Sequence, residues 1–415
     1  MRTDCDVVVV GAGLVGLATA YRLLQLRPDL ALTVVDKENT VAAHQSGHNS
    51  GVLHAGIYYQ PGSLKARLCV AGKAQVEQYA AERGIPVEHC GKLIVAASET
   101  ELPRLHTLYE RGVANGVVGV REIGPEELRD YEPHAIGVRA VHVPPTGIID
   151  FAAVARSLAE DVAAAGGRLR LGQQLVGVGP GGDARVLELA SGERLSTRLM
   201  VSCAGLQADR VAALTASASP GSGNPDGKTA ARAAIVPFRG DYYTLTLSAR
   251  HLVRGLIYPV PDPALPFLGV HLTKRHDGAV WAGPNAVLAL AREGYRRRDV
   301  TPADLLDTVR FSGFRRLARR YWRVGAQEMW RDFVKGAFLR DLQRYVPQLR
   351  RQDLVFGPSG VRAQAVDGDG SLVDDFRLVE APGVLHVLNA PSPAATASLA
   401  IGGVLAERAV ASLAD

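Results

Sequence analysis

The stretch that decides the fold is CDVVVVGAGLVGLATAYRLLQLRPDLALTVVD, residues 5–36. It opens with a continuous apolar run at 5–10, which predicts a strand buried on both faces. Apolar residues then recur at helical spacing over 14–26, and a second apolar run follows at 31–36. The sequence therefore predicts a β-α-β unit with a right-handed crossover.

Three glycines in G-x-G-x-x-G spacing lie at the turn between the first predicted strand and the helix. Gly11 permits the tight turn, Gly13 lets a pyrophosphate approach the backbone, and Gly16 allows close packing of helix on strand. The helix N-terminus offers unpaired N–H groups to phosphates. Asp36 ends the second strand 20 residues after Gly16, where a carboxylate can accept hydrogen bonds from an adenosine ribose. The pattern predicts a Rossmann-like dinucleotide site, and the acid at the ribose position disfavours NADP.

Two later segments favour FAD over NAD. Residues 198–203 predict a strand that runs into Ala204 and Gly205 and then into a helix, so that backbone can again approach a cofactor closely. Residues 393–396 open the last predicted helix and supply a second helix N-terminus for a ring or a phosphate. We therefore expect FAD as the cofactor.

The length of 415 residues exceeds what one hydrophobic core usually supports. Consecutive strands are predicted over 233–284 and basic helices over 302–345, between two β/α segments. We expect an α/β protein in which a Rossmann-like FAD-binding domain is interleaved with a substrate domain, a mixed or antiparallel β-sheet flanked by helices. The expected FAD-binding domain comprises residues 1–80, 140–215 and 355–415, the substrate domain comprises 81–139 and 230–354, and 216–229 is a flexible loop.

Composition narrows the class of protein. The net charge of +5 is small for this length, and no basic face with interleaved aromatic residues indicates nucleic-acid binding. The four cysteines are scattered without a C-x-x-C pair, which favours unpaired thiols in a reducing compartment and no metal site. A predicted strand by residue 5 leaves no room for a signal peptide, and no apolar run reaches the roughly 18 residues that span a bilayer. We expect a cytoplasmic protein.

The segment HNSGVLHAGIYY, residues 48–59, resembles the L-2-hydroxyglutarate oxidase/dehydrogenase family, within the D-amino-acid-oxidase-like FAD superfamily. Further blocks that match it run through the whole chain: PGSLK (61–65), PFRGDYY (237–243), LGVHLT (268–273), GVRAQ (360–364) and SPAATASLAIG (392–402). Ala394 departs from the pattern, because a glycine is expected there. The resemblance implies FAD contacts at Gly11, Gly13, Gly16, Asp36, Lys37, Ser46, Ser50, Gly51, Val176, Ala204, Gly205, Gly360 and Thr396.

The resemblance implies FAD-dependent oxidation of L-2-hydroxyglutarate to 2-oxoglutarate, with hydride transfer from Cα to the flavin. A related flavoenzyme that oxidises another small α-hydroxy or α-amino acid, such as glycine or sarcosine, is the alternative enzyme. A binding module that uses the cofactor only structurally is the non-enzymatic alternative. The two enzyme classes differ because an amine must lose a proton before it can give up hydride.

Oxidation of an α-hydroxy acid needs a base for the hydroxyl proton, and two histidines are candidates. His271 lies on an apolar predicted strand with small neighbours, where it can face the flavin and take the hydroxyl proton near neutral pH. His54 lies in a Gly-rich segment that the resemblance places beside the flavin ring, and it is the rival base. A hydrogen-bonded core histidine is the structural alternative for His271.

The carboxylate of such a substrate needs a cation. The resemblance places Arg362 above the flavin, where a planar guanidinium can bind the α-carboxylate with two hydrogen bonds and fix the direction of the Cα–H bond. Arg239 is the second candidate for this role. Lys274 and Tyr258 are candidates for a distal carboxylate, and Tyr58 is a further substrate-binding candidate.

Residues 310–323, RFSGFRRLARRYWR, combine arginine with aromatic residues. One interpretation is a helix whose apolar stripe packs on the sheet domain. A second is contact with an anionic membrane surface, where a quinone or another electron acceptor resides, which would place the protein peripherally on the inner membrane.

Overall fold

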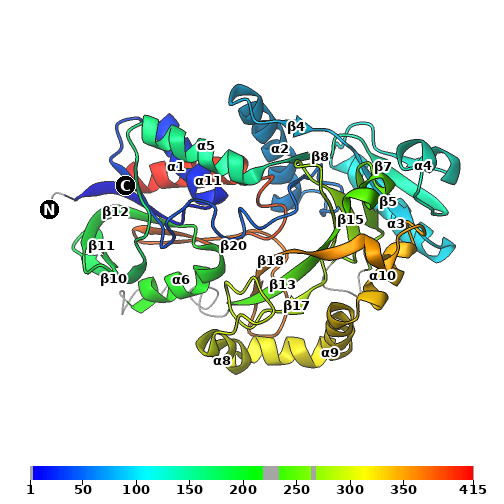
Figure 1. The fold of residues 1–415 in the computed structure, drawn as a ribbon. Coiled ribbons are helices and arrows are strands. Elements are labelled where there is room, and N and C mark those ends of the chain that lie inside the picture. Colours follow the sequence, from blue (N-terminus) through cyan, green and yellow to red (C-terminus); the bar gives the residue numbers. More distant parts are fainter. Residues whose placement is uncertain (1–2, 218–232, 263–267, 415) are drawn as a thin grey trace.

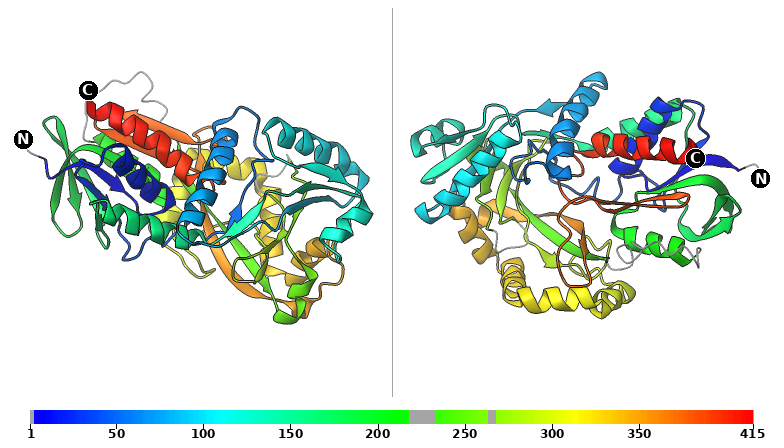
Figure 2. Two further views of the ribbon diagram at one scale, coloured as in Figure 1. Left: turned by 90° about the horizontal axis from the view of Figure 1, so that it is seen from above. Right: turned by 180° about the vertical axis from the view of Figure 1, so that it is seen from behind.

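Two β-sheets, each covered by its own helices, form the two halves of the molecule (Figure 1). The computed structural model describes residues 3–217, 233–262 and 268–414. Both chain termini lie at the same end, in the first half, in every view (Figure 2). The α/β class predicted from the sequence is confirmed.

The first sheet contains the predicted β-α-β unit at its centre. Its strand order is β19-β20-β12-β1-β2-β9, and every neighbouring pair is parallel except β19 with β20. The hairpin β10–β11 adds to the first part of β12. The strands are β1 (Cys5–Val10), β2 (Leu32–Val35), β9 (Arg168–Arg170), β10 (Leu175–Gly181), β11 (Ala184–Leu189), β12 (Arg194–Ser202), β19 (Arg377–Ala381) and β20 (Val384–Asn389).

Helices α1 (Leu14–Leu26), α5 (Phe151–Ala164) and α11 (Ser398–Ala414) pack together over this sheet. Their apolar faces join β1 and β2 in one core, which explains the four consecutive valines of β1: a central parallel strand is covered on both sides. On the other side lies α6 (Ala208–Ser217).

The second sheet is mixed, with order β17-β13-β16-β15-β14-β5-β7-β6 and β18 paired to β13. Only β14 and β5 pair in parallel. A small third sheet has the order β3-β8-β4. The strands are β3 (Val52–Leu53), β4 (Val87–Glu88), β5 (Lys92–Ala96), β6 (Arg121–Ile123), β7 (Arg139–Val143), β8 (Gly147–Ile149), β13 (Ala234–Leu245), β14 (Leu256–Pro259), β15 (His271–Lys274), β16 (Val280–Gly283), β17 (Val287–Leu288) and β18 (Leu354–Val366).

Helices surround the second sheet, and α8 and α9 lie along one outer edge of the molecule (Figure 1). These helices are α3 (Leu102–Ala114), α4 (Pro125–Tyr131), α8 (Pro302–Arg310), α9 (Ser312–Phe333) and α10 (Lys335–Gln343). Helix α2 (Leu64–Glu82) instead packs against α11 and joins the core of the first half. Short 3-10 turns occur at Glu99–Glu101, Gly205–Gln207, Leu247–Leu252 and Arg351–Asp353.

Two strands lie across the expected domain boundaries at residues 140 and 355. Strand β7 pairs with β5, and β18 pairs with β13 over most of its length, so both belong to the second sheet. The division into an FAD-binding domain and a substrate domain stays a prediction. Of the expected loop 216–229, residues 216 and 217 close α6 and the rest lies outside the described residues.

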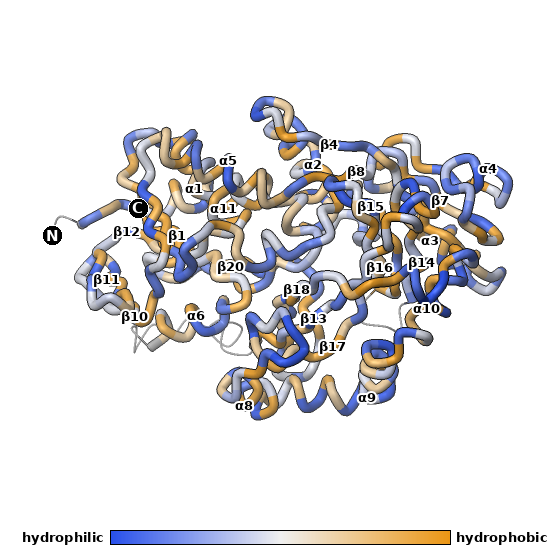
Figure 3. Tube along the Cα trace, viewed as in Figure 1, coloured by the Kyte–Doolittle hydropathy of each residue, from blue (hydrophilic) through white to orange (hydrophobic). Residues whose placement is uncertain are grey.

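Strand β18 connects the halves. The side chain of Asn389, at the end of β20, accepts a hydrogen bond from Ala365 N at 3.3 Å and donates to Val373 O at 3.0 Å. Hydrophobic residues concentrate inside both halves, while the outer helix α9 carries many hydrophilic ones (Figure 3). Within the described ranges, no helix is both long enough and apolar enough to cross a bilayer.

Candidate active site

Two adjoining cavities lie between the sheets. The first, of about 660 Å³, lies at the carboxyl ends of β1, β2 and β12. The second, of about 770 Å³, lies between the two halves. Both are lined by Gln45, Ala363, Ala390, Ala394 and Ala395, so they form one continuous space. An elongated ligand can therefore occupy both.

The glycine-rich turn forms one wall of the first cavity. Gly11 has φ +111°, and a Cβ there would lie 2.4 Å from the Cys203 carbonyl oxygen, so only glycine fits. The Asp36 carboxylate lines the cavity and accepts hydrogen bonds from Ala12 N at 2.6 Å and Glu38 N at 2.8 Å. The loop and the acid at the ribose position are thus fixed to each other.

The N-terminus of α1 faces the same cavity. Gly13 lines it, and the hydroxyl of Ser46 accepts a hydrogen bond from Leu14 N at 2.9 Å. Gly16 lines neither cavity; a Cβ there would lie 1.9 Å from Gly11 O, so this glycine allows the helix to pack against the turn. Ser46 marks the position where a phosphate would meet the helix N-terminus.

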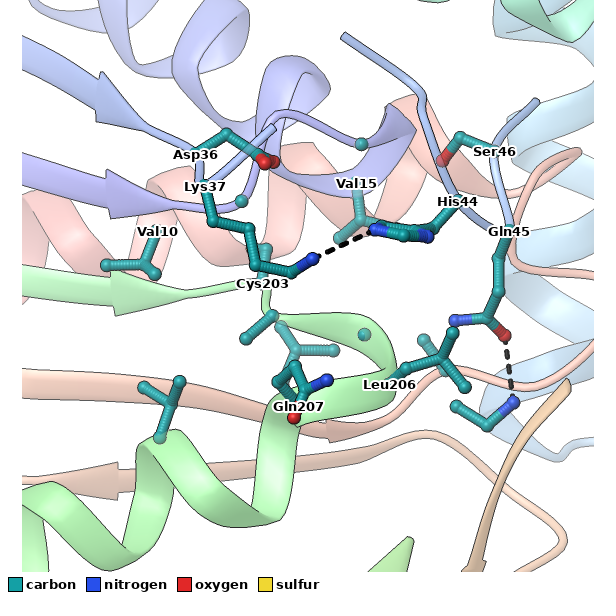
Figure 4. A pocket seen from close by; sticks show the side chains of 18 of the residues that line it. Val10, Val15, Asp36, Lys37, His44, Gln45, Ser46, Cys203, Leu206 and Gln207 are labelled. Carbon is teal, nitrogen blue, oxygen red and sulfur yellow. Dashed lines mark hydrogen bonds between the residues drawn. The ribbon is translucent and has the colours of Figure 1, made fainter. Parts of the chain in front are cut away.

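Lys37 also lines the first cavity, but its ammonium is occupied (Figure 4). It hydrogen-bonds to Glu293 at 2.8 Å, to His44 Nε2 at 3.2 Å, and to Glu38. Glu38, His44 and Glu293 are close enough together to hold a metal ion, but the lysine already provides their shared positive charge. This cluster ties the first domain to the second.

The remaining expected cofactor positions divide between the cavities. Val176, Ala204 and Gly205 line the first, whereas Ser50, Gly51, Gly360 and Thr396 line the second. Sequence reasoning missed Gln45, which lines both and whose side-chain oxygen accepts a hydrogen bond from Ala363 N at 3.0 Å. The residues fit FAD, because the glycine cradle, the helix N-terminus and the ribose acid all face a space long enough for a dinucleotide.

His271 lines the second cavity, and its ring orientation is fixed. Nδ1 lies 2.9 Å from Gly269 O, and since a carbonyl can only accept, Nδ1 carries the proton and Nε2 keeps its lone pair. Burial lowers the pKa of His271 to about 3, helped by the charges of Lys92 and Arg362. The imidazole is therefore a neutral acceptor at neutral pH.

His54 lines the same cavity. Its backbone N–H donates to Thr396 Oγ1 at 3.1 Å, which ties the segment after β3 to the start of α11. Burial lowers the pKa of His54 well below its usual range, with contributions from Lys92 and His271. Both candidate bases thus face one chamber in the neutral form.

Arg362, Tyr58 and Tyr258 line this chamber too. Arg362 interacts with Tyr242, which also lines it. The hydroxyl of Tyr58 is buried and has no hydrogen-bond partner among the described residues, so it can donate to a ligand. The chamber thus brings Arg362, two tyrosines and two neutral histidines together. Its lining also contains Arg111, Lys65, His48, Tyr59 and three aspartates, Asp262, Asp374 and Asp375.

Two expected substrate residues do not reach either cavity. Arg239 is buried, and its Nε pairs with Asp241 at 2.9 Å while its Nη1 donates to Arg296 O at 3.2 Å. Lys274, at the end of β15, is paired with Glu88. The strand alternation explains both outcomes, because neighbouring positions on a strand point to opposite faces.

Sequence reasoning also missed Lys92, whose side chain lies beside the rings of Tyr58 and Tyr258. The only signal was a lysine at the head of an otherwise apolar strand, KLIVA.

Comparison with known proteins identifies the class. The family model described as FAD dependent oxidoreductase matches residues 6–408. The chain belongs to this family, and the expectation of an FAD-binding oxidoreductase is confirmed. The L-alpha-glycerophosphate oxidase of Mycoplasma pneumoniae, solved with FAD bound, is 23% identical with a TM-score of 0.77, covering 99% of this chain and 95% of that one. Glycine oxidase from Geobacillus kaustophilus is 18% identical with a TM-score of 0.69, covering 98% and 95%.

Individual relatives are more similar in sequence. The chain is 44% identical to the L-2-hydroxyglutarate dehydrogenase of Indibacter alkaliphilus over 98% of this chain and 99% of the relative. It is also 44% identical to the mitochondrial L-2-hydroxyglutarate dehydrogenase of Homo sapiens, over 97% and 88%. The resemblance expected from the motifs is confirmed at the level of the family.

Proposed function

We propose that this chain oxidises L-2-hydroxyglutarate to 2-oxoglutarate with FAD as the hydride acceptor. The observation that carries the proposal is the orientation of His271: its Nδ1–H is held by Gly269 O, which leaves Nε2 as a proton acceptor inside the chamber that also contains Arg362. The relatives from Indibacter alkaliphilus and Homo sapiens, which are named for this substrate and match nearly the whole chain, support the choice of substrate.

Each residue has a distinct role in the proposal. Arg362 binds the α-carboxylate, and the hydroxyl of Tyr58 donates to the same substrate. His271 Nε2 takes the hydroxyl proton, while the bound flavin supplies the acceptor for the hydride that leaves Cα. His54, which lines the same chamber, orients the substrate and is the alternative base. His271 and Tyr258 are buried, so the interactions of these two groups act at low dielectric.

An α-hydroxy acid fits the chamber better than an α-amino acid. An amino group enters as an ammonium ion, and His54, His271 and Arg362 offer it no negative charge. The carboxylates that line the cavity are already engaged: Asp262 pairs with Arg104, Asp374 pairs with Lys65, and Asp375 accepts hydrogen bonds from the backbone N–H groups of Leu64 and Lys65. Both histidines have lowered pKa values, so at neutral pH they are uncharged and keep a lone pair that can accept a hydrogen bond from the substrate hydroxyl.

Anaerobic reduction of the purified flavoprotein tests the proposal. L-2-hydroxyglutarate should bleach the flavin absorbance, whereas D-2-hydroxyglutarate, glycine and L-lactate should not do so at the same concentration. Bleaching by glycine but not by L-2-hydroxyglutarate would overturn the assignment.

We further propose that the electron acceptor is reached at an anionic membrane surface through α9. The proposed contact surface extends beyond residues 310–323 to the end of α9. Four large apolar side chains are exposed there: Trp322 at 62%, Trp330 at 61%, Met329 and Phe333. Exposed arginines such as Arg319 and Arg320 flank them. Aromatic residues beside cations suit a headgroup interface. The four unpaired cysteines favour a reducing compartment, so the surface would be the cytoplasmic face of an inner membrane.

A further inference from the structure

Lys92 is a buried cation that the reaction described above does not use. It begins β5, which lies between β14 and β7, and its side chain is 1% exposed. Its ammonium lies 4.1 Å from the ring centroid of Tyr258 and 5.1 Å from that of Tyr58. Within the described ranges, no aspartate or glutamate pairs with it. A buried lysine without such a partner is costly, so its charge needs an explanation.

The groups around Lys92 provide no negative charge at neutral pH. Burial raises the pKa of Cys69 to about 12 and that of Cys90 to about 11. Burial also raises the pKa values of Tyr58 and Tyr258 above the ordinary value of a tyrosine. Titratable groups from five segments of the chain interact electrostatically with Lys92 or lie beside its ammonium. They are His54 and Tyr58 after β3, Cys69 on α2, Cys90 before β5, Tyr258 on β14 and His271 on β15. An anion that enters with the contents of the chamber would therefore favour the charged form of Lys92.

The substrate class of the proposed function brings such an anion. A 2-hydroxy dicarboxylate carries two negative charges, and Arg362 balances one of them in the proposal. Of the other cations that line the chamber, Lys65 is paired with Asp374, whereas Arg111 can share the second charge with Lys92. Tyr58 and Tyr258 both line the chamber, and Lys92 lies beside their rings without lining it. A charge separated from a ligand only by side chains in a low-dielectric interior still acts on it strongly.

We propose that Lys92 is a positioning residue that adds a buried positive charge behind the substrate chamber, acting through the tyrosine pair rather than by direct contact. This inference rests on the proposed function. The same charge opposes protonation of His271, which the two substrate carboxylates would otherwise favour, so the base remains neutral in the complex.

The pH dependence of kcat/KM tests this role. Burial lowers the pKa of Lys92 to about 7, and kcat/KM reports ionisations of the free enzyme. In the wild type, kcat/KM for L-2-hydroxyglutarate should therefore fall as pH rises through that value. In Lys92→Met the fall should be absent and KM should rise about tenfold or more, with a smaller change in kcat, as expected for removal of one charge interaction. Lys92→Arg, which stays charged, should lack the fall while retaining a lower KM than Lys92→Met.

Lys335→Met is the matched control. Lys335 also lies beside a tyrosine ring of the second domain, 5.7 Å from the centroid of Tyr243, but lines neither cavity. This variant should keep the wild-type profile. An unchanged alkaline fall in Lys92→Met would overturn the inference.

Proton uptake by the wild-type holoenzyme decides the question even if Lys92→Met does not fold. Glutarate, a non-reactive dicarboxylate, is titrated calorimetrically at pH 8 in two buffers of different ionisation enthalpy. Binding should take up protons, because a dianion raises the pKa of Lys92, and Lys92→Met should take up fewer. Glutarate that binds without proton uptake, or does not bind, overturns the inference. The proposed function fails separately, if L-2-hydroxyglutarate does not bleach the wild-type flavin.

Discussion

The imidazole of His271 stacks on the ring of Tyr258, with centroids 3.9 Å apart and planes inclined by 23°. The register of the antiparallel pair β14–β15 produces this contact, since Leu256 faces Thr273 and Ile257 faces Leu272, which brings Tyr258 opposite His271. A shift of one residue would turn the histidine to the other face of the sheet. The position of the proposed base is thus a property of the strand pairing.

Replacing the proposed base should slow the chemical step. His271→Asn keeps a donor for Gly269 O but removes the acceptor at Nε2. We expect kcat to fall by about 10²–10⁴, the usual contribution of a general base, with little change in KM. Steady-state kinetics with an artificial electron acceptor measure this. His54→Asn should lose less kcat, and the reverse order would make His54 the base.

The two arginine candidates should respond differently to the same substitution. Arg362→Met removes the proposed carboxylate ligand and should raise KM by about 10² or more, as loss of a charge-assisted contact predicts. Arg239→Met breaks a buried ion pair with Asp241 and should lower the free energy of unfolding by about 3–5 kcal/mol. Kinetics and urea denaturation of both variants separate binding from stability. A normal KM in Arg362→Met would remove this residue from the substrate site.

A methyl group at Gly13 should block the cofactor without disturbing the apoprotein. The backbone there is extended, and a Cβ would approach only the Ser46 side chain, at 3.0 Å. Gly13→Ala should therefore retain its melting temperature as apoprotein but bind FAD at least about tenfold more weakly, because the pyrophosphate loses its close approach. Fluorescence titration with FAD measures the affinity. Gly124→Ala, where a Cβ meets open space, is the control and should bind FAD normally.

Membrane contact through α9 should depend on its exposed tryptophans. The double variant Trp322→Ser/Trp330→Ser should sediment with vesicles containing anionic lipid at least about fivefold less than the wild type at low salt, because interfacial aromatic residues bury apolar area in the headgroup region. Val118→Ser, at an exposed apolar residue outside α9, should behave like the wild type. Equal sedimentation of all three proteins, or none by the wild type, would contradict the proposal.

Acid should destabilise the protein through its buried histidines, and His386 allows a test outside the active site. It is hydrogen-bonded to Thr215 at 3.0 Å, and burial lowers its pKa to about 4. Because the folded pKa lies below the unfolded one of about 6.5, the unfolded chain binds more protons as pH falls from 6.5 towards 4, and stability is lost in that window. Between pH 7 and 5 the wild type should lose about 2 kcal/mol more unfolding free energy than His386→Gln. Equal losses of unfolding free energy in the wild type and in His386→Gln would show that His386 is not the group responsible.

The first β-α-β unit, its glycine turn and the ribose acid could be read from residues 5–36 because they depend on local patterns: apolar runs, helical spacing and backbone without a Cβ. The resemblance of residues 48–59 then indicated the family. The candidate bases His54 and His271 were found in the same way, as histidines in apolar or glycine-rich surroundings.

Tertiary structure alone decided which polar side chains share the chamber. Arg239 and Arg362 both lie on paired strands, β13 and β18, yet only Arg362 lines the cavity, while Arg239 pairs with Asp241. Lys92 lies behind the chamber wall because β5 pairs with β14 and so brings it beside Tyr258. Local sequence encodes which residues are strand or helix, but the side chains that meet across strands are set by register and long-range pairing, which no short stretch contains.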